Sequence, residues 1–458
     1  MSEQGKEMNE AQLNVHLLEL LDLEAIDDFR DEFLEMHPYD QAKFYMLLIP
    51  EQRQKLYQFL SPEEMAEVFE NLEIPEENYQ ELLSEMHPTF AADMLGEMYA
   101  DDAVDVLNEL DKEQVASYLA IMDGESAQEI KDLLHYEEDT AGSIMTTEYV
   151  AIRSHQTVRS AMQILRKEAP DAETIYYIFV IDEEKKLVGV VSLRDLIVSD
   201  EETMISDIMN ERVVSASVAD DQEIVAKTMR DYNFLAIPVV DFQKHLLGII
   251  TVDDVLDVID EEASEDYSKL AGVSDVESMN TSSLQSAKKR LPWLVILLFL
   301  GMMTASLIGH FEDTLNKVAI LAVFIPLIAG MSGNTGTQAL AVAVRGLATG
   351  DIEREGIWKM IMRELGTGLI VGTSCGILVT GVVYVWQHDF FLGLLVGISI
   401  FATLIVATLA GALVPMLMHR LKIDPAVASG PFITTLNDLL SILIYFGLAT
   451  TFMSYLQK

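Results

Sequence analysis

The sequence is short of two kinds of residue: cysteine, and the basic residues that would balance its acidic ones. One cysteine, Cys375, among 458 residues excludes an intramolecular disulfide and a zinc site made of several thiolates. With 30 Lys and Arg against 74 Asp and Glu, the formal net charge is −44, which disfavours a nucleic-acid partner because both molecules would be negative. The sequence has no Walker loop, no His–carboxylate metal pair and no nucleophile–base pair, so we expect no enzymatic activity.

Charge divides the chain into two unlike parts. Residues 1–290 hold 65 acidic and 22 basic residues, a net charge of −43, whereas residues 291–458 hold nine and eight, a net of −1. The first part is therefore predicted to be a soluble acidic region whose field attracts cations. The second part, which is largely apolar, is predicted to be a membrane domain.

Five apolar runs in the second part are long enough to cross about 30 Å of hydrocarbon as helices. Basic residues gather before the first run, after the second and after the fourth. By the positive-inside rule this side is cytoplasmic, so we expect a multi-pass protein of the cell membrane with its N-terminus inside and its C-terminus outside. The runs cover residues 291–310, 318–344, 365–386, 391–418 and 431–456.

Residues 1–138 show apolar positions at helical spacing with acidic outer faces. The sequence EMHP occurs at Glu35–Pro38 and again at Glu85–Pro88, and each copy opens a segment of similar pattern. This spacing predicts an all-helical repeat or superhelix.

Residues 139–260 change to short β runs between helices, and the pattern repeats. LVGVVSLRDLI at residues 187–197 is echoed by LLGIITVDDVL at residues 246–256. Each copy, about 139–205 and 206–260, predicts strand, helix, strand, strand, helix. The duplicated element of Gly, two apolar residues, Ser or Thr, and Asp three positions later resembles that of tandem CBS (cystathionine-β-synthase-type) domains.

The resemblance to CBS domains implies two roles, which stay open as alternatives. One is binding of an adenosine nucleotide such as ATP as a regulatory ligand, with the matching residues being Tyr177 or Phe234 beside the base, Arg194 at the phosphates and Asp195 at the ribose. The other is a pair that serves dimerisation alone.

Residues 253–275 predict one long connecting helix, followed by a linker and basic collar over residues 276–290. Eight acids occur within the 14 residues from Asp253 to Asp266. Like charges four residues apart weaken a helix unless a cation bridges them. The segment is therefore either a solvated acidic face or a cation-binding surface.

The fifth apolar run contains a carboxylate, Asp438, among residues that are otherwise apolar or small. A charge near the centre of a bilayer costs about 2.5–3.5 kcal/mol even on lenient scales, so such residues usually face a cavity or an ion path. No Lys or Arg lies well inside another run to pair with it. We therefore expect an acid that lines a pathway; a carboxyl kept neutral is the alternative.

The second run contains PLIAGMSGNTGTQ, from Pro326 to Gln338. Its proline and glycines permit close helix packing or local unwinding, and its amides and hydroxyls offer oxygen ligands. At 1.5 Å per residue, Asn334 and Asp438 lie about 16 and about 10 Å from the same membrane side, with Asp424 at the inner mouth. An all-oxygen site with few charged ligands suits Mg²⁺ better than softer metals or a Ca²⁺ cage.

With these segments the chain resembles the MgtE family of magnesium channels over essentially its whole length. The resemblance implies a homodimer in the bilayer, with a pore along its two-fold axis and Asp438 as the selectivity carboxylate. Expected pore-lining residues are Gly330, Gly333, Asn334 and Asn437. Expected Mg²⁺ ligands besides Asp438 and Asp424 are Asp254, Asp257, Glu262, Glu265 and Asp266, with Asp101 and Asp105 in the helical domain and Asp221 in the second CBS-like repeat.

We therefore expect a Mg²⁺-selective channel that imports the ion and closes when cytosolic Mg²⁺ binds the acidic domains. The alternative is a secondary transporter that couples Mg²⁺ to H⁺ or Na⁺, because a titratable Asp438 suits both mechanisms. A CBS-bearing chloride channel is disfavoured because its filter should carry donors and basic residues rather than an acid. A membrane-anchored enzyme would not need five spans with a polar core.

Overall fold

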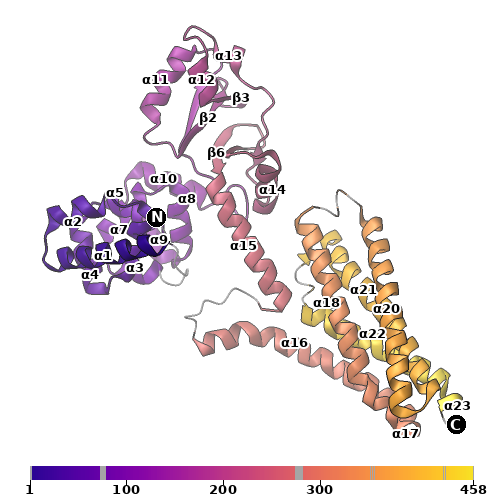
Figure 1. Ribbon diagram of the computed structural model, residues 1–458. Helices are drawn as coiled ribbons and strands as arrows, with labels where there is room; N and C mark the ends of the chain where they lie inside the picture. Colours follow the sequence, from indigo (N-terminus) through magenta and orange to yellow (C-terminus); the bar gives the residue numbers. More distant parts are fainter. Residues whose placement is uncertain are drawn as a thin grey trace. The chain divides into compact units, whose positions relative to one another are not determined.

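The structure is a computed structural model that divides into two compact units, Met1–Asp260 and Glu261–Lys458. It contains the helical N-terminal part, the tandem α/β repeats and the helical C-terminal part that the sequence predicts (Figure 1). The predicted fold class is therefore confirmed. The residues described are 3–72, 79–273, 282–350, 356–425 and 430–456, together with Ile352, Arg354 and Ala428.

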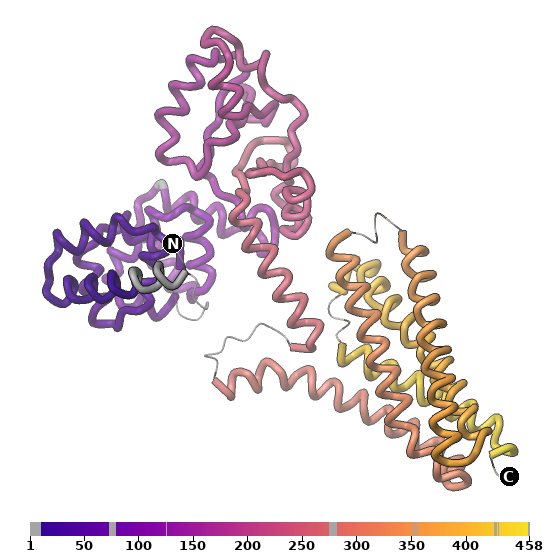
Figure 2. Tube along the Cα trace, viewed as in Figure 1, coloured from indigo at the N-terminus to yellow at the C-terminus, as the bar shows by residue number. Residues whose placement is uncertain are grey.

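The N-terminal part of the first unit is built from short helices stacked on one another (Figure 2). α3 packs on α5, α5 on α7 and α7 on α9, which is the neighbour-to-neighbour contact of a helical repeat. In the described residues these helices are α1 (Glu3–Asp22), α2 (Ile26–Phe33), α3 (Pro38–Leu47), α4 (Pro50–Phe59), α5 (Pro62–Glu70), α6 (Tyr79–Ser84), α7 (Pro88–Glu97), α8 (Ala100–Asn108), α9 (Lys112–Ile121) and α10 (Gly124–Leu133).

The two EMHP sequences begin equivalent helices. Pro38 and Pro88 occupy the first positions of α3 and α7, where a missing backbone N–H costs nothing. In each case the preceding histidine caps the helix, because its Nδ1 accepts a 3.3 Å hydrogen bond from the backbone N–H two residues on. The repeated sequence thus marks two helices that begin in the same way and that each pack on the next but one helix.

Each CBS-like repeat contains a three-stranded sheet of the same topology. The strand orders are β1-β2-β3 and β4-β5-β6, with the first pair of strands parallel and the second pair antiparallel. The first repeat contains β1 (Tyr149–Arg153), α11 (Val158–Glu168), β2 (Thr174–Ile181), β3 (Leu187–Ser192), α12 (Leu193–Val198) and α13 (Ile205–Ile208). The second contains β4 (Ala216–Ser217), α14 (Gln222–Tyr232), β5 (Ala236–Val240), β6 (Leu246–Thr251) and the start of α15 (Val252–Ala271).

The second unit contains helices long and apolar enough to cross a membrane. Within the described residues five segments qualify: Ser283–His310, Ala319–Ala348, Ile357–Gln387, Phe390–Arg420 and Gly430–Thr451. The elements are α16 (Ser283–His310), α17 (Glu312–Lys317), the 3₁₀ helix η2 (Ala319–Phe324), α18 (Ile325–Ala348), α20 (Ile357–Gln387), α21 (Phe390–Arg420), α22 (Gly430–Thr451) and α23 (Met453–Leu456).

These helices differ most from the predicted runs at the starts of α16 and α20. α16 begins at Ser283, because Ser282 and Gln285 form a capping box that extends the helix through the basic collar. α20 begins at Ile357 rather than at residue 365. Arg, Lys and Glu are good helix formers, so the helices continue beyond the apolar residues. The rest of the expected linker, residues 276–281, and the last residues of the expected connecting helix, 274–275, lie outside the described residues.

The second span is not unwound at its glycines. α18 runs without a break from Ile325 to Ala348, and Pro326 lies in its first turn, where proline is tolerated. The irregular backbone is instead the 3₁₀ segment η2 before it. Of the two possibilities that the glycines left open, Gly333 and Gly336 show close helix packing, whereas Gly330 is exposed.

Candidate functional site

Asp438 lies on α22, eight residues after the helix begins at Gly430, or about 12 Å along its axis. Its side chain is half-buried, and none of the described residues provides a basic partner for it. The neighbouring hydroxyl of Ser441 donates to the Asp438 backbone oxygen at 2.9 Å, not to the carboxylate. The carboxylate is therefore available to a cation.

Contacts between α18 and α22 fix the level of Asp438. Ser332 Oγ donates to the backbone oxygen of Asn437 at 3.0 Å. Four residues further along α18, a Cβ on Gly336 would come within 1.8 Å of the Asn437 amide nitrogen, so a larger residue there would displace the Asn437 side chain. Asp438 therefore lies at the level of residues 332–336, as the depth estimate from the sequence predicts for Asn334.

The four residues expected to line the pore separate into two pairs. Gly330 and Asn334, with Gln338, are exposed in this chain and lie four residues apart on one face of α18. Gly333 and Asn437 instead lie in the α18–α22 contact, where Asn437 is fully buried and a Cβ on Gly333 would meet Thr434 at 2.7 Å. The first pair is therefore exposed in a single chain, whereas the second pair packs the helices.

Asp424 lies between α21 and α22 and is held by a lysine from the end of α15. Lys269 Nζ donates to Asp424 Oδ2 at 2.6 Å and also pairs with Glu265, one turn earlier on α15. Burial, followed by the charge of Asp424, raises the pKa of the adjacent Asp266 to about 6. Of the expected ligands, the structure therefore brings Glu265, Asp266 and Asp424 together around the side-chain ammonium group of Lys269.

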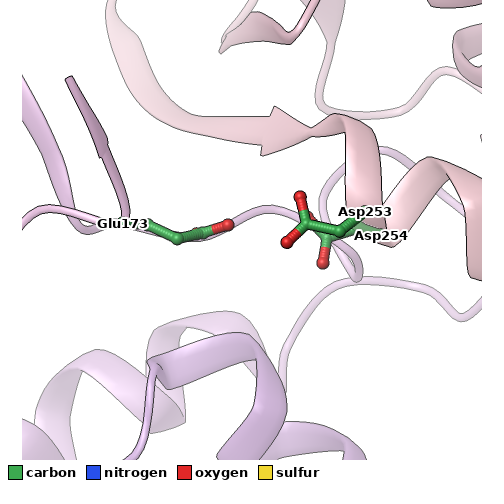
Figure 3. Close-up of side chains that lie close together, drawn as sticks. All are labelled: Glu173, Asp253 and Asp254. Atoms are coloured by element: carbon green, nitrogen blue, oxygen red, sulfur yellow. The ribbon is translucent and has the colours of Figure 1, made fainter. Parts of the chain in front are cut away.

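A second group of carboxylates lies in the first unit, and we call it the Asp254 cluster: Asp101 and Asp102 of α8, Glu173 before β2, and Asp253 and Asp254 at the start of α15. Figure 3 shows Glu173 facing Asp253 and Asp254, whose carboxylate oxygens lie within 4.8 Å of one another. Asp254 Oδ2 also accepts a 2.6 Å hydrogen bond from the Thr251 hydroxyl. The end of β6 thus fixes the orientation of this carboxylate.

The Asp254 cluster is electrostatically strained. Asp101 is only 7% exposed, and burial, then the charges of Asp102 and Asp254, raises its pKa well above the usual value. Burial, then Glu70 and Asp254, raises the pKa of Asp102 to about 8. Burial, then Asp254, raises the pKa of Glu173 to about 7. These carboxyls therefore favour either a proton or a cation.

The donor atoms of this cluster fit a hard divalent ion. Among the described residues, Asp101 Oδ1 and Glu173 Oε2 are buried without a hydrogen-bond partner, and such atoms are costly unless something binds them. Carboxylate oxygens are the ligands that Mg²⁺ and Ca²⁺ prefer. A divalent cation held by Glu173, Asp253 and Asp254 would bind the Glu173 carboxylate and reduce the repulsion on the other acids of the cluster.

The remaining expected ligands lie on exposed surfaces or at the edges of these groups. Asp105 on α8 and Asp257 on α15 are exposed, and each adds its charge to the Asp254 cluster. Asp221 caps α14, because its Oδ1 accepts from the Glu223 backbone at 2.9 Å. Glu262 is half-buried and acts on Asp266 through its charge.

The residues expected at a nucleotide are distributed over both CBS-like repeats. Tyr177 of β2 pairs in register with Ser192 of β3, and Asp195 forms a capping box with that serine. Arg194, next to Asp195, is exposed. Phe234, in the second repeat, stacks on Tyr232 with ring centroids 5.3 Å apart. The structure thus brings Tyr177 and Asp195 to one strand pair and Phe234 to another repeat.

Sequence reasoning missed Glu173. It is one of many acids in the first 290 residues, and no motif marks it. Its closeness to Asp254 depends on how β2 and β6 are placed, so the one available signal was its position directly before a predicted strand.

Three descriptions of protein families match this sequence. Residues 325–448 match the MgtE divalent cation transporter family. Residues 36–139 match the MgtE intracellular N domain, and residues 141–201 and 205–261 match the CBS domain.

The chain is similar to curated transporters over nearly its full length. A magnesium transporter MgtE from Enterococcus faecalis is 56% identical over 452 residues, which cover 99% of each chain. The magnesium transporter MgtE of Bacillus subtilis is 41% identical, over 96% of this chain and 98% of that protein.

Two solved structures resemble the acidic part. The soluble part of a magnesium transporter is 56% identical, covers 56% of this chain and 99% of its own, and has a TM-score of 0.55. The cytosolic domain of the Mg²⁺ channel MgtE in complex with ATP is 42% identical, covers 54% of this chain and 99% of its own, and has a TM-score of 0.50.

Proposed function

The chain belongs to the MgtE family of magnesium transporters, and from this premise we propose that it is a Mg²⁺-selective channel that imports the ion across the cytoplasmic membrane. The observation that carries the proposal is Asp438, a carboxylate on a membrane-spanning helix with no basic partner among the described residues. It lies level with the exposed polar face of α18 formed by Gly330, Asn334 and Gln338.

The working unit is a homodimer in the bilayer. In a single chain the polar face of α18 has no cover, and a polar face directed at lipid would be costly. A second copy related by a two-fold axis would cover this face and place two Asp438 carboxylates at one level. Mg²⁺ keeps much of its hydration shell and is usually held by one or two carboxylates, so two such groups suit its charge and size.

The decisive experiment is Mg²⁺ flux into proteoliposomes that contain wild type or the Asp438→Asn variant. Asparagine keeps the shape and removes the charge, so we expect flux to fall to near background while the protein elutes as wild type does. Asp438→Glu should keep partial flux. Asp313→Asn, the same change at an exposed position of α17, is the matched control. Wild-type flux in Asp438→Asn would refute the pathway.

Closure by cytosolic Mg²⁺ is the second part of the proposal. The Asp254 cluster and the acids of α15 repel one another when no cation is present, and bridging ions favour a compact arrangement. A ligand shifts such an equilibrium through its differential affinity for the two states, and a change from 1:99 to 99:1 needs about 5.5 kcal/mol. Several weak sites filled together supply a difference of this size.

A charge-neutralised variant tests this closure. Millimolar Mg²⁺ should slow proteolysis of the acidic region and close the channel in wild type. Both effects should be lost after replacement by Asn or Gln of Asp254, Asp257, Glu262, Glu265 and Asp266. The control neutralises five exposed acids of the N-terminal helical part: Asp27, Asp28, Asp31, Glu35 and Glu51. A variant that still closes at wild-type Mg²⁺ levels would show that these acids are only a solvated face.

ATP is proposed as a regulatory ligand of the CBS-like pair. Support comes from the solved relative that contains ATP and from the exposed Arg194 beside Asp195. Calorimetry on the full chain should show ATP binding that Arg194→Ala weakens. Absence of binding to wild type would leave the pair as a dimerisation module.

Coupled transport of Mg²⁺ with H⁺ or Na⁺ is the second candidate, because Asp438 is titratable. Current measurements separate the two mechanisms. A channel current reverses at the Mg²⁺ equilibrium potential, whereas coupled transport reverses elsewhere and moves with the H⁺ or Na⁺ gradient.

A further inference from the structure

A cavity at one end of the membrane-spanning helices has no part in the proposed pathway. It measures about 310 Å³ and lies between the last turns of α18 and the first turns of α20. Three basic side chains line it: Arg345 of α18, and Lys359 and Arg363 of α20. Its inner wall is apolar, because Ile352 and Met360 belong to a small buried cluster. The cavity thus combines cations at its rim with an apolar wall.

The surroundings of this cavity are those of a membrane–water interface. Trp358, next to Lys359, is 70% exposed, and Ile357 is 55% exposed. Tryptophan is enriched at headgroup level, where its ring meets apolar chains and its N–H meets polar groups. Arg363 Nε pairs with Glu364 at 3.2 Å, which orients the guanidinium group at the helix start. An amphiphile with a negative head matches both parts of this surface.

We propose that this cavity binds the headgroup phosphate of an anionic phospholipid. The phosphate would lie among Arg345, Lys359 and Arg363, since guanidinium and ammonium groups are the usual phosphate ligands in proteins. The first carbons of the lipid would pack on Ile352 and Met360. Basic pockets between membrane-spanning helices bind anionic headgroups in this way, and the site is independent of which ion the protein transports.

Tryptophan fluorescence can report this lipid directly, because Trp358 lies beside the cavity. The chain has three tryptophans, so Trp293→Phe with Trp386→Phe leaves Trp358 as the single reporter. The protein is reconstituted in phosphatidylcholine that contains a minor fraction of brominated phosphatidylglycerol or, separately, of brominated phosphatidylcholine. We expect the anionic quencher to quench Trp358 more strongly than the zwitterionic one at the same fraction.

A variant that loses the three charges should lose this excess. Arg345→Gln, Lys359→Gln and Arg363→Gln should each lower the preference for anionic lipid by about fivefold. Arg345→Lys with Arg363→Lys keeps the charges and should keep most of the preference. If the Gln variants fold less well, this Lys variant and the wild type still test the proposal by their excess quenching.

Two controls locate the effect. In a second single-tryptophan protein, Trp293→Phe with Trp358→Phe leaves only Trp386, at the other end of α20. We expect both brominated lipids to quench Trp386 equally. Glu312→Gln with Asp313→Asn changes two charges at exposed positions of α17, outside the cavity lining, and should not reduce the excess at Trp358.

Three outcomes would overturn the proposal. Equal quenching of Trp358 by both lipids would show that no anionic lipid is enriched there. An excess that survives the triple Gln variant would place the lipid elsewhere. An excess removed by inorganic phosphate, but not by chloride at the same ionic strength, would show a site for small anions instead of a lipid.

Discussion

Asp254 and Asp266 lie near the two ends of the same helix, α15, but the charges around them differ in kind. The charged groups acting on Asp101, Asp102 and Glu173 beside Asp254 are acidic. Beside Asp266, by contrast, Lys269 pairs with both Glu265 and Asp424. In the Asp254 cluster, no basic side chain among these interactions offsets the repulsion between the carboxylates. In the group around Asp266, the Lys269 ammonium group offsets it.

This difference separates a cation-dependent contact from a cation-independent one. Repulsion between like charges in a partly buried site grows as the surrounding water is removed, so we expect bound protons or metal ions to stabilise the compact Asp254 cluster. Lys269 supplies a positive charge at a fixed place, so the end of α15 is held at Asp424 without either. We therefore expect the Asp254 cluster to respond to Mg²⁺ and pH, and the Lys269 group to respond weakly.

The largest expected effect is on the response of the first unit to Mg²⁺. Asp101→Asn with Asp254→Asn removes two repelling charges and keeps an oxygen for the Thr251 hydrogen bond. Without Mg²⁺ the unfolding temperature of the variant should exceed that of wild type, by about 2–4 °C for each kcal/mol of repulsion removed. Mg²⁺ should then stabilise it much less than wild type. Calorimetric scans with and without millimolar MgCl₂ measure both.

The control for that experiment is Asp28→Asn with Asp260→Asn, which removes the same charge from exposed positions. It should keep the wild-type gain in unfolding temperature on adding Mg²⁺. An equal loss in both variants would mean that Mg²⁺ acts on net charge alone and not at this cluster.

A smaller effect is expected from pH in the absence of Mg²⁺. The pKa of Asp102 is raised to about 8 and that of Glu173 to about 7 in the folded protein. For a raised pKa, stability is fully present below the unfolded value and is lost as the pH rises through the folded value. Lowering the pH from above 8 toward 6 should therefore raise the unfolding temperature, and saturating Mg²⁺ should flatten this dependence.

The smallest effect should come from converting the second group into a copy of the first. Lys269→Gln leaves Glu265, Asp266 and Asp424 without their ammonium partner, so hydrogen exchange of the backbone amides at residues 268–273 should speed up. Mg²⁺ should slow it again, because a divalent ion can take the place of the ammonium group. Lys269→Arg, which keeps the charge, is the control. If neither Lys269→Gln nor Mg²⁺ changed the exchange rate of these amides, the ion pair would not hold this end of α15.

Much of the architecture followed from local features of the sequence. The apolar runs, the EMHP repeat and the duplicated CBS-like element predicted the fold class, because hydrophobic length and periodicity are properties of single segments. Asp438 stood out for the same reason: a lone carboxylate in an apolar run needs no partner to be noticed. Helix ends were less well predicted, since α16 and α20 continue through charged residues that favour helix but are not apolar.

Only the tertiary structure decided which side chains meet. Lys269 and Asp424 are 155 residues apart. Glu173 reaches Asp254 because the start of β2 and the end of β6, strands of different repeats, lie near each other. Asn437 is buried against Gly336 and does not lie with the exposed face of α18. Glycine has no Cβ, and this leaves room for the Asn437 amide at that position. Composition and periodicity determine what each segment can form, whereas such pairings depend on how the finished helices and strands pack, which no single segment encodes.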